Sequence, residues 1–211
     1  MYAIIIFMVA GGCLALANRV EMGNWKTSNK EKIGSLLYSV MVGGIIDMLA
    51  KERDIPGFYM AVFAGSLLFA CVTDIRCCEV FRFTWWIGCG SGICFLVTEI
   101  LCRKEFPAGL LFLPLYIGLQ EMLFSQTYGR ADSHAFSACA IMQCTLKMNI
   151  EWYFLHMVLA FCCIIMVQAM QKNIGRWGIL KRPVAFLPYI TVSFWGMTAV
   201  WEKFYTDFYA L

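Results

Sequence analysis

The sequence predicts an all-α protein, a polytopic transmembrane bundle of about eight helices, with six to eight spans compatible with the pattern. Hydrophobic residues make up 61% of the 211 residues and charged residues 15%, against roughly 45–50% and about 25% in soluble domains. Apolar stretches near the roughly 17–25 residues that cross a bilayer follow one another along the chain. This composition argues against a disordered chain, a nucleic-acid-binding module and a soluble enzyme.

Eight stretches are apolar enough to be candidate spans, and we interpret them as one membrane-embedded domain over residues 1–211. The weakest of them is the sixth, because Lys147 lies near its end. The second contains Asp47, which is costly in lipid. In chain order they are Met1–Ala17, Ile33–Ala50, Phe58–Thr73, Trp85–Cys102, Pro107–Phe124, His134–Asn149, Trp152–Met170 and Ala185–Trp201.

The distribution of cations predicts the orientation of these spans. Cytoplasmic loops carry an excess of Lys and Arg, and an N-terminus on the outer side places most of the 17 cations in the cytoplasm. The predicted cytoplasmic set is Arg19, Lys26, Lys30, Lys32, Arg76, Arg82, Arg130, Lys172, Arg176, Lys181 and Arg182. The lipid bilayer is therefore an expected partner. A net charge of +3 is too small to predict nucleic-acid binding, and the oligomeric state is left open.

The 11 cysteines are odd in number, and most lie within apolar runs. This pattern is typical of buried thiols rather than of a disulfide framework. No Cys pair or Cys/His group has the spacing of a zinc site. We therefore expect neither a metal ion nor another cofactor.

Two acidic residues lie at the ends of predicted spans. Asp74 ends the third, and Asp132 precedes the sixth. Two spans separate them, so the chain returns to the same membrane face, which the charge bias makes cytoplasmic. Other acids within the spans are Glu121, Glu99 and Asp47, for which we favour packing or interfacial roles, with a place near the site as the alternative for Glu121.

Two close carboxyl groups cannot both ionise easily, so such a pair holds one proton. The ionised member takes a proton from water, and the protonated member polarises an amide carbonyl and then supplies the leaving amine. Each Asp has an alternative interpretation as a solvated residue at a helix end, where an acid near an N-terminus also suits the helix dipole.

Three segments together resemble the prepilin peptidases, membrane aspartyl proteases that mature type IV pilins and archaellins. Asp74-Ile75-Arg76 is similar to the start of the family's first motif, D-x-R-x-x-x-I-P-N. Gly129-Arg130-Ala131-Asp132 is similar to its G-x-G-D motif, and residues 184–189, Val-Ala-Phe-Leu-Pro-Tyr, are similar to its C-terminal I-P-F-G-P-F segment. The resemblance implies that Asp74 and Asp132 are catalytic and that Arg76, Gly129, Ala131 and His134 support them.

The chain departs from the family pattern in four places. Ala131 replaces the second glycine of G-x-G-D, His134 replaces a common Lys, and residues 80–82 replace Ile-Pro-Asn. Many bacterial members also carry a cytoplasmic methylation domain after the first helix. Only Asn18–Lys32 occupies that place here, so we expect no methyltransferase activity.

The resemblance implies a pilin-like precursor as substrate, with a short basic leader, a Gly before the cut and an apolar helix after it. Two other functions stay open. One is a Cys/His membrane peptidase that processes a signalling peptide and uses His134 or His156. The other is a non-catalytic membrane assembly or transport protein.

Overall fold

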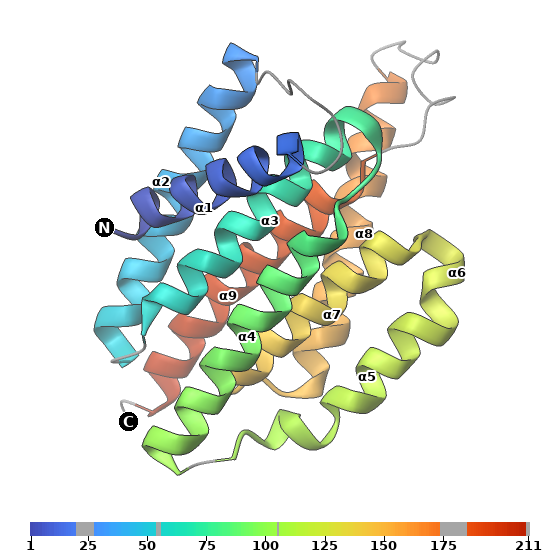
Figure 1. Ribbon diagram of the computed structural model, residues 1–211. Coiled ribbons are helices and arrows are strands. Elements are labelled where there is room, and N and C mark those ends of the chain that lie inside the picture. The colour runs from blue at the N-terminus through green and yellow to red at the C-terminus, as the bar shows by residue number, and fades with distance from the viewer. Residues whose placement is uncertain (20–27, 54–55, 105, 174–184, 210–211) are drawn as a thin grey trace. The chain divides into compact units, whose positions relative to one another are not determined.

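The computed structural model describes residues 1–19, 28–53, 56–104, 106–173 and 185–209, and these residues form helices without any β-strand (Figure 1). The predicted all-α class is confirmed. Four helices in this part of the chain are long and apolar enough to cross a membrane: Asn29–Lys51, Gly57–Cys77, Arg82–Cys102 and Ile150–Met170. They indicate a membrane-embedded protein.

The contacts divide the chain into two compact units. Unit 1 comprises Met1–Val72 and Val80–Phe106. It contains α1 (Tyr2–Ala17), α2 (Asn29–Arg53), most of α3 (Gly57–Cys77) and α4 (Arg82–Arg103). Unit 2 comprises Thr73–Glu79 and Pro107–Leu211, so the last turn of α3 belongs to it.

Close helix contacts hold unit 1 together at two glycines. A Cβ on Gly43 of α2 would lie 2.8 Å from the backbone nitrogen of Ala3 in α1. A Cβ on Gly65 of α3 would lie 2.8 Å from the carbonyl oxygen of Ile6. Small residues at such points allow helices to approach in lipid, where dispersion contacts rather than water exclusion drive association. α1 therefore packs directly on both α2 and α3.

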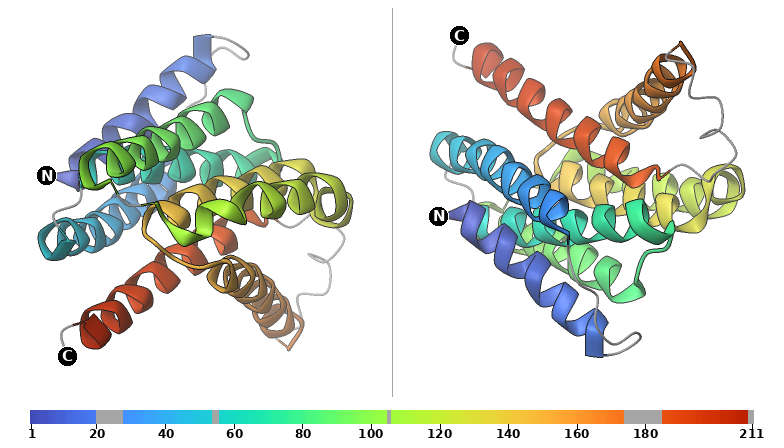
Figure 2. Two further views of the ribbon diagram at one scale, coloured as in Figure 1. Left: turned by 90° about the horizontal axis from the view of Figure 1, so that it is seen from below. Right: turned by 90° about the horizontal axis from the view of Figure 1, so that it is seen from above.

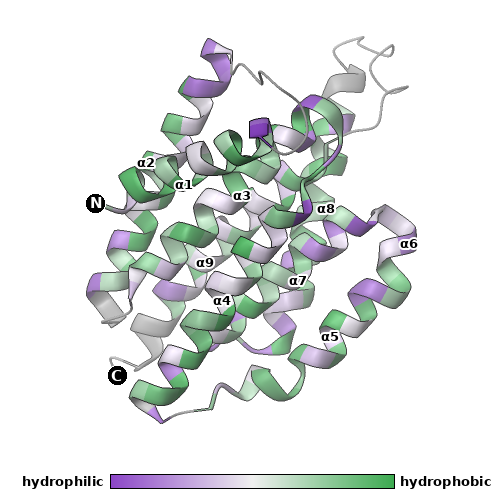
Figure 3. Ribbon diagram, viewed as in Figure 1, coloured by the Kyte–Doolittle hydropathy of each residue, from purple (hydrophilic) through white to green (hydrophobic). Residues whose placement is uncertain are grey.

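The N-terminus of α2 is fixed by a capping box. The backbone N–H of Ser28 donates to Glu31 Oε2 at 2.7 Å, and the backbone N–H of Glu31 donates to Ser28 Oγ at 3.3 Å. This reciprocal pair satisfies donors that a helix start leaves open. Figure 3 shows that the strongly hydrophilic residues of α2 lie near its two ends, as expected for a helix with an apolar middle.

Unit 2 is built around α7 (Arg130–Thr145), which is buried at every residue from Ala135 to Thr145. Before it come the 3₁₀ turn η2 (Ala108–Leu111), α5 (Leu113–Leu119), the π-helical η3 (Gln120–Phe124) and the short α6 (Ser125–Tyr128). After it come α8 (Ile150–Asn173) and α9 (Leu187–Tyr209). Figure 2 shows α5 running beside α7.

The structure corrects two of the predicted spans, and a count of about eight is not confirmed. Residues 107–124 form a 3₁₀ turn, an α-helix and a π-helix in succession instead of one α-helix. The segment begins with a short 3₁₀ turn because of its two prolines. Pro107 precedes that turn and Pro114 lies at the beginning of α5, and a proline has no N–H to donate to a helix. The predicted sixth span, His134–Asn149, begins earlier, at Arg130, and ends at Thr145.

Several residues of the predicted C-terminal motif and cytoplasmic loops lie outside the described part of the chain. They are Val184 of the C-terminal motif and four of the predicted cytoplasmic cations, Lys26, Arg176, Lys181 and Arg182.

Candidate active site

The first predicted acid, Asp74, lies in the last turn of α3 within unit 2, and only 7% of it is exposed. Its Oδ2 atom accepts a hydrogen bond from the backbone N–H of Leu187 at 3.0 Å, and the backbone of Phe186 donates to the same carboxylate. Leu187 is the first residue of α9. A carboxylate at this position satisfies amides that a helix N-terminus leaves open and also interacts favourably with the helix dipole.

The second acid, Asp132, lies in the first turn of α7, outside the four apolar helices. Gly129 is the N-cap of this helix and has φ 112° and ψ 155°, a conformation that is essentially restricted to glycine. A Cβ at Gly129 would lie 3.6 Å from Asp132 Oδ2. The first glycine of the G-x-G-D-like segment thus sets the sharp turn that places Asp132 at the start of α7.

The two acids affect each other electrostatically within unit 2. Burial, followed by the negative charge of Asp74, raises the pKa of Asp132 to about 7. A carboxyl group with such a pKa keeps its proton close to neutral pH, whereas an ordinary Asp has lost it. The fold therefore brings two acids that lie far apart along the chain near enough for the charge of Asp74 to affect the ionisation of Asp132.

A cluster of four aromatic rings links the start of α7, which carries Asp132, to the start of α9, whose backbone amide donates to Asp74. Phe186, next to Leu187, has ring centroids 4.9 Å from Phe161, 6.0 Å from Phe136 and 6.2 Å from Tyr128. Tyr128 precedes Gly129, and Phe136 is one turn beyond Asp132. The pairs of Phe186 with Phe136 and Tyr128 are edge-to-face, and such pairs add stability beyond that of their buried area. The cluster joins α6, α7 and α8 to the α9 start that binds Asp74.

A third acid, Glu121, contacts two residues in the first turns of α7, Ser133 and His134. Its Oε1 atom lies 2.8 Å from His134 Nδ1 and accepts a hydrogen bond from Ser133 Oγ at 3.2 Å. Glu121 projects from the π-helical η3, and such π-helical turns often occur at functional sites. From the sequence a packing role was favoured for Glu121 and a place near the site was the alternative, because residue spacing alone does not reveal a π-turn.

The remaining predicted residues take the following places. Arg76 lies half-buried in the last turn of α3, and Ala131 lies half-buried in the first turn of α7. His156 is fully buried in α8, where its Nε2 lies 2.9 Å from the carbonyl oxygen of Ile190. The partners of His134 and His156 named here are a carboxylate and a carbonyl, not thiols.

Among the described residues, no group of His, Cys, Asp and Glu is arranged to hold a metal ion. Comparison of the chain with protein-family models, with curated proteins and with solved structures gives no match. Any functional interpretation therefore depends on the residues and their geometry.

Proposed function

We propose that this protein is a membrane-embedded aspartic endopeptidase that removes the short basic leader of a pilin-like precursor at the cytoplasmic membrane face. The observation that supports it most is the pairing of Asp74 and Asp132 in unit 2, where the charge of one raises the pKa of the other. An acid pair with one shared proton is the chemistry that aspartyl hydrolysis needs.

The surroundings of the two carboxyl groups favour different roles for them. Backbone amides donate to Asp74, so its carboxyl oxygens act as hydrogen-bond acceptors, as those of a negatively charged carboxylate do. Asp132 lies beside that charge and has a pKa of about 7, so it holds the proton. We assign Asp74 as the general base and Asp132 as the general acid.

In this mechanism a water molecule lies between the two carboxyl groups. Asp74 takes one proton from the water while the oxygen of the water bonds to the carbonyl carbon of the scissile amide. Asp132 donates a hydrogen bond to the carbonyl oxygen, which becomes negative in the tetrahedral intermediate. The C–N bond then breaks, and the amine leaves with a proton from the pair. The pair has then received one proton from the water and given one to the amine, so it ends with the single proton with which it began.

The substrate class is the one that the resemblance to prepilin peptidases implies, and the position of the acids supports it. Asp74 ends an apolar helix, Gly57–Cys77, that is long enough to cross the membrane, so a peptide bond cut here lies at a membrane face. A precursor whose apolar helix lies in the bilayer presents its leader at the same level. Carboxylates at the site attract a basic leader over distances up to about the Debye length, about 8 Å in physiological salt.

The test is cleavage of model precursors by the full chain in lipid vesicles. Each precursor has a basic leader, a Gly before the cut and an apolar helix. Asp74→Asn and Asp132→Asn should each lower kcat/KM by about 10²-fold or more, because general acid or base catalysis contributes that much. Asp47→Asn is the matched control, since this acid pairs with Lys51 at 2.7 Å in α2, and cleavage should persist.

Two outcomes would overturn the proposal. If the folded chain cuts none of a panel of such precursors, it is not a prepilin-type peptidase. If both Asn variants stay active while a Cys→Ser exchange abolishes cleavage, the nucleophile is a thiol and the Cys/His alternative holds.

The dependence of the rate on pH is a separate check of the shared proton. Because Asp132 must be protonated to act as the acid, kcat/KM should fall as the pH rises through about 7. It should also fall at low pH, where Asp74 becomes protonated and no longer accepts a proton from water. A rate that stays flat from pH 5 to 8 would exclude these roles.

A further inference from the structure

Unit 1 contains a cavity of about 240 Å³ between α1, α2 and α3. Its walls are almost entirely apolar. α1 contributes one stripe of residues at helical spacing, and α3 contributes the residues of its last turns before Val72. The lining includes Phe7, Gly11, Leu14, Leu68, Phe69 and Lys32.

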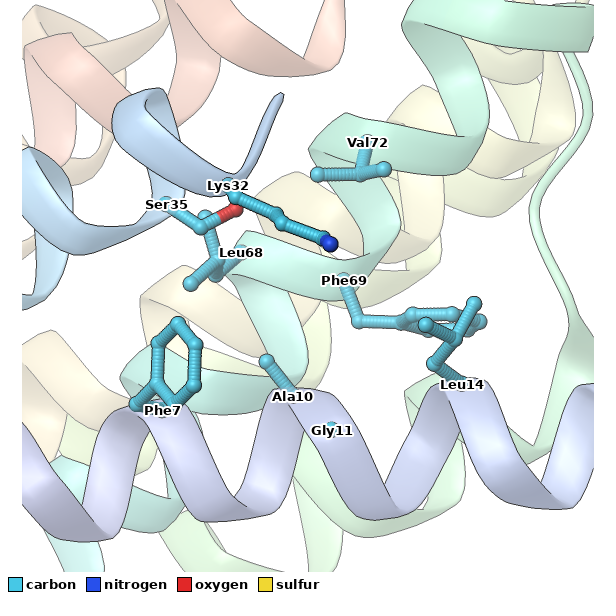
Figure 4. A pocket seen from close by; sticks show the side chains of 9 residues that line it. All are labelled: Phe7, Ala10, Gly11, Leu14, Lys32, Ser35, Leu68, Phe69 and Val72. Carbon is cyan, nitrogen blue, oxygen red and sulfur yellow. The ribbon is translucent and has the colours of Figure 1, made fainter. Parts of the chain in front are cut away.

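Lys32 is the only charged residue among those that line this cavity. Figure 4 shows its side chain extending from α2 into the space between Val72 and Phe69. No acidic side chain is part of the lining, and the neighbouring Glu31 accepts the backbone N–H of Ser28 in the capping box. An ammonium group beside apolar walls fits a ligand that has both a negative charge and a hydrocarbon part.

The shape of the ligand matters as well as its charge. An α-helix with its side chains is about 10 Å wide. A single acyl chain is much narrower and is flexible, so it can follow an irregular apolar space between helices. A Cβ built on Gly11 meets no atom within 4 Å, so the space over this glycine is open to such a chain.

The position of the cavity within the helices agrees with a lipid. It lies toward the C-terminal half of α1, at the first turns of α2 and at the last turns of α3. These helix ends are where a membrane-crossing bundle meets the headgroup layer, and Lys side chains near helix ends extend to that layer. We call the apolar part of the cavity, over Gly11, the slot. Along the membrane normal, Lys32 and the slot are thus arranged as the headgroup and the acyl chain of a phospholipid are.

We propose that this cavity binds one anionic phospholipid, with its phosphate on Lys32 and one acyl chain in the slot over Gly11. The site belongs to unit 1 alone and does not depend on the proposed peptidase activity.

The experiment measures lipid binding to the full chain in a neutral detergent by native mass spectrometry. Phosphatidylglycerol and phosphatidylcholine with the same chains are compared. One phosphatidylglycerol per chain should bind preferentially. Lys32→Gln should weaken that binding about fivefold, the effect of one cation on an anionic lipid. Gly11→Leu should prevent binding by filling the slot, and Ala10→Leu, at another lining position, is a second filling variant.

Two matched controls come from neighbouring residues. Lys30 is an exposed lysine of α2 that does not line the cavity, and a Cβ on Gly12 also meets no atom within 4 Å although this glycine is not part of the lining. Lys30→Gln and Gly12→Leu should bind phosphatidylglycerol as the native chain does. Circular dichroism shows whether each variant keeps its helix content.

The proposal is overturned if both lipids bind equally, or if Lys30→Gln weakens binding as much as Lys32→Gln. It is also overturned if folded filling variants bind as the native chain does. Glycerol phosphate, which has no acyl chain, should not displace the lipid. If it does so at the same concentration as phosphatidylglycerol, the slot has no part in binding and the site is one for free phosphate.

Discussion

The helices α7 and α8 of unit 2 show opposite relations between polarity and burial. α7 contains Ser, Gln and Thr side chains and is buried at every residue from Ala135 to Thr145. α8 is strongly apolar, yet only 17% of its apolar window is buried. In water such an exposed apolar helix would promote aggregation. In a bilayer lipid covers α8, while the polar groups of α7 avoid lipid by lying inside the protein.

This difference matters for the candidate site because α7 carries Asp132 at its first turn. A helix that is enclosed by its neighbours positions its ends rigidly. The acid at its start is half-buried, and the pKa of Asp132 is raised as a result. α8 contributes the covering ring of Phe161 to the aromatic cluster but presents most of its surface outward.

The largest expected difference between α7 and α8 is in their chemical labelling by a probe that is dissolved in the lipid. A photoactivated carbene probe dissolved in the bilayer should modify α8, where the side chain of Ile165 is 62% exposed. It should leave residues 135–145 of α7 unmodified, because the probe does not reach a helix enclosed by protein. Peptide mass spectrometry reads out the result. Equal labelling of both helices would contradict the enclosure of α7.

A second test concerns the turn before α7. Gly129→Ala should destabilise the protein by about 1–3 kcal/mol, the cost of a side chain in a conformation reserved for glycine, and should lower cleavage because Asp132 is displaced. Unfolding in a denaturing detergent and the cleavage assay measure these effects. The control is Gly118→Ala in α5, where a Cβ meets no atom within 4 Å and stability should be kept or increased. Equal effects at both positions would refute the argument.

A matched pair of isoleucines compares the two helices directly. Ile141 of α7 is 7% exposed, and Ile165 is an exposed residue of α8. Ile141→Val should cost about 0.5–1.5 kcal/mol, because a lost methyl group leaves a gap in packed protein. Ile165→Val should change stability by less than about 0.5 kcal/mol, since lipid fills the space. The same unfolding assay applies, and the opposite order would exclude lipid as the neighbour of α8.

The smallest effect is expected at the ion pair beside the site. The side chains of His134 and Glu121 are 42% and 38% exposed, and pairs at such positions contribute about 0–1 kcal/mol. His134→Ala should therefore lower stability by no more than that and should leave cleavage largely intact. A loss of cleavage as great as in Asp132→Asn would give His134 a direct part in the chemistry.

Predictions from the sequence were most reliable for features that are local in the chain. The predicted third span, Phe58–Thr73, falls within α3, which continues to Cys77, since the formation of an apolar helix depends mostly on nearby residues. The unbroken span over residues 107–124 was wrong. Pro107 and Pro114 were visible, but the π-turn at Gln120–Phe124 depends on packing that a single sequence does not encode locally.

The environment of the site could not be predicted in the same way. Leu187 donates its N–H to a carboxylate 113 residues earlier, and Glu121 contacts Ser133 and His134 across a broken helix. These contacts depend on how helices pack. The resemblance selected Asp74 and Asp132 from several acids, but only the packed unit shows that the charge of one acts on the other.

The sequence by itself determined that the chain is helical and rich in membrane-length apolar segments, because hydrophobic content and helix formation are properties of short stretches. The tertiary structure decided which helix is enclosed, which amides reach Asp74 and how strongly Asp132 holds its proton. These are properties of side chains brought together from distant parts of the chain, where burial and neighbouring charge set the free energy of ionisation.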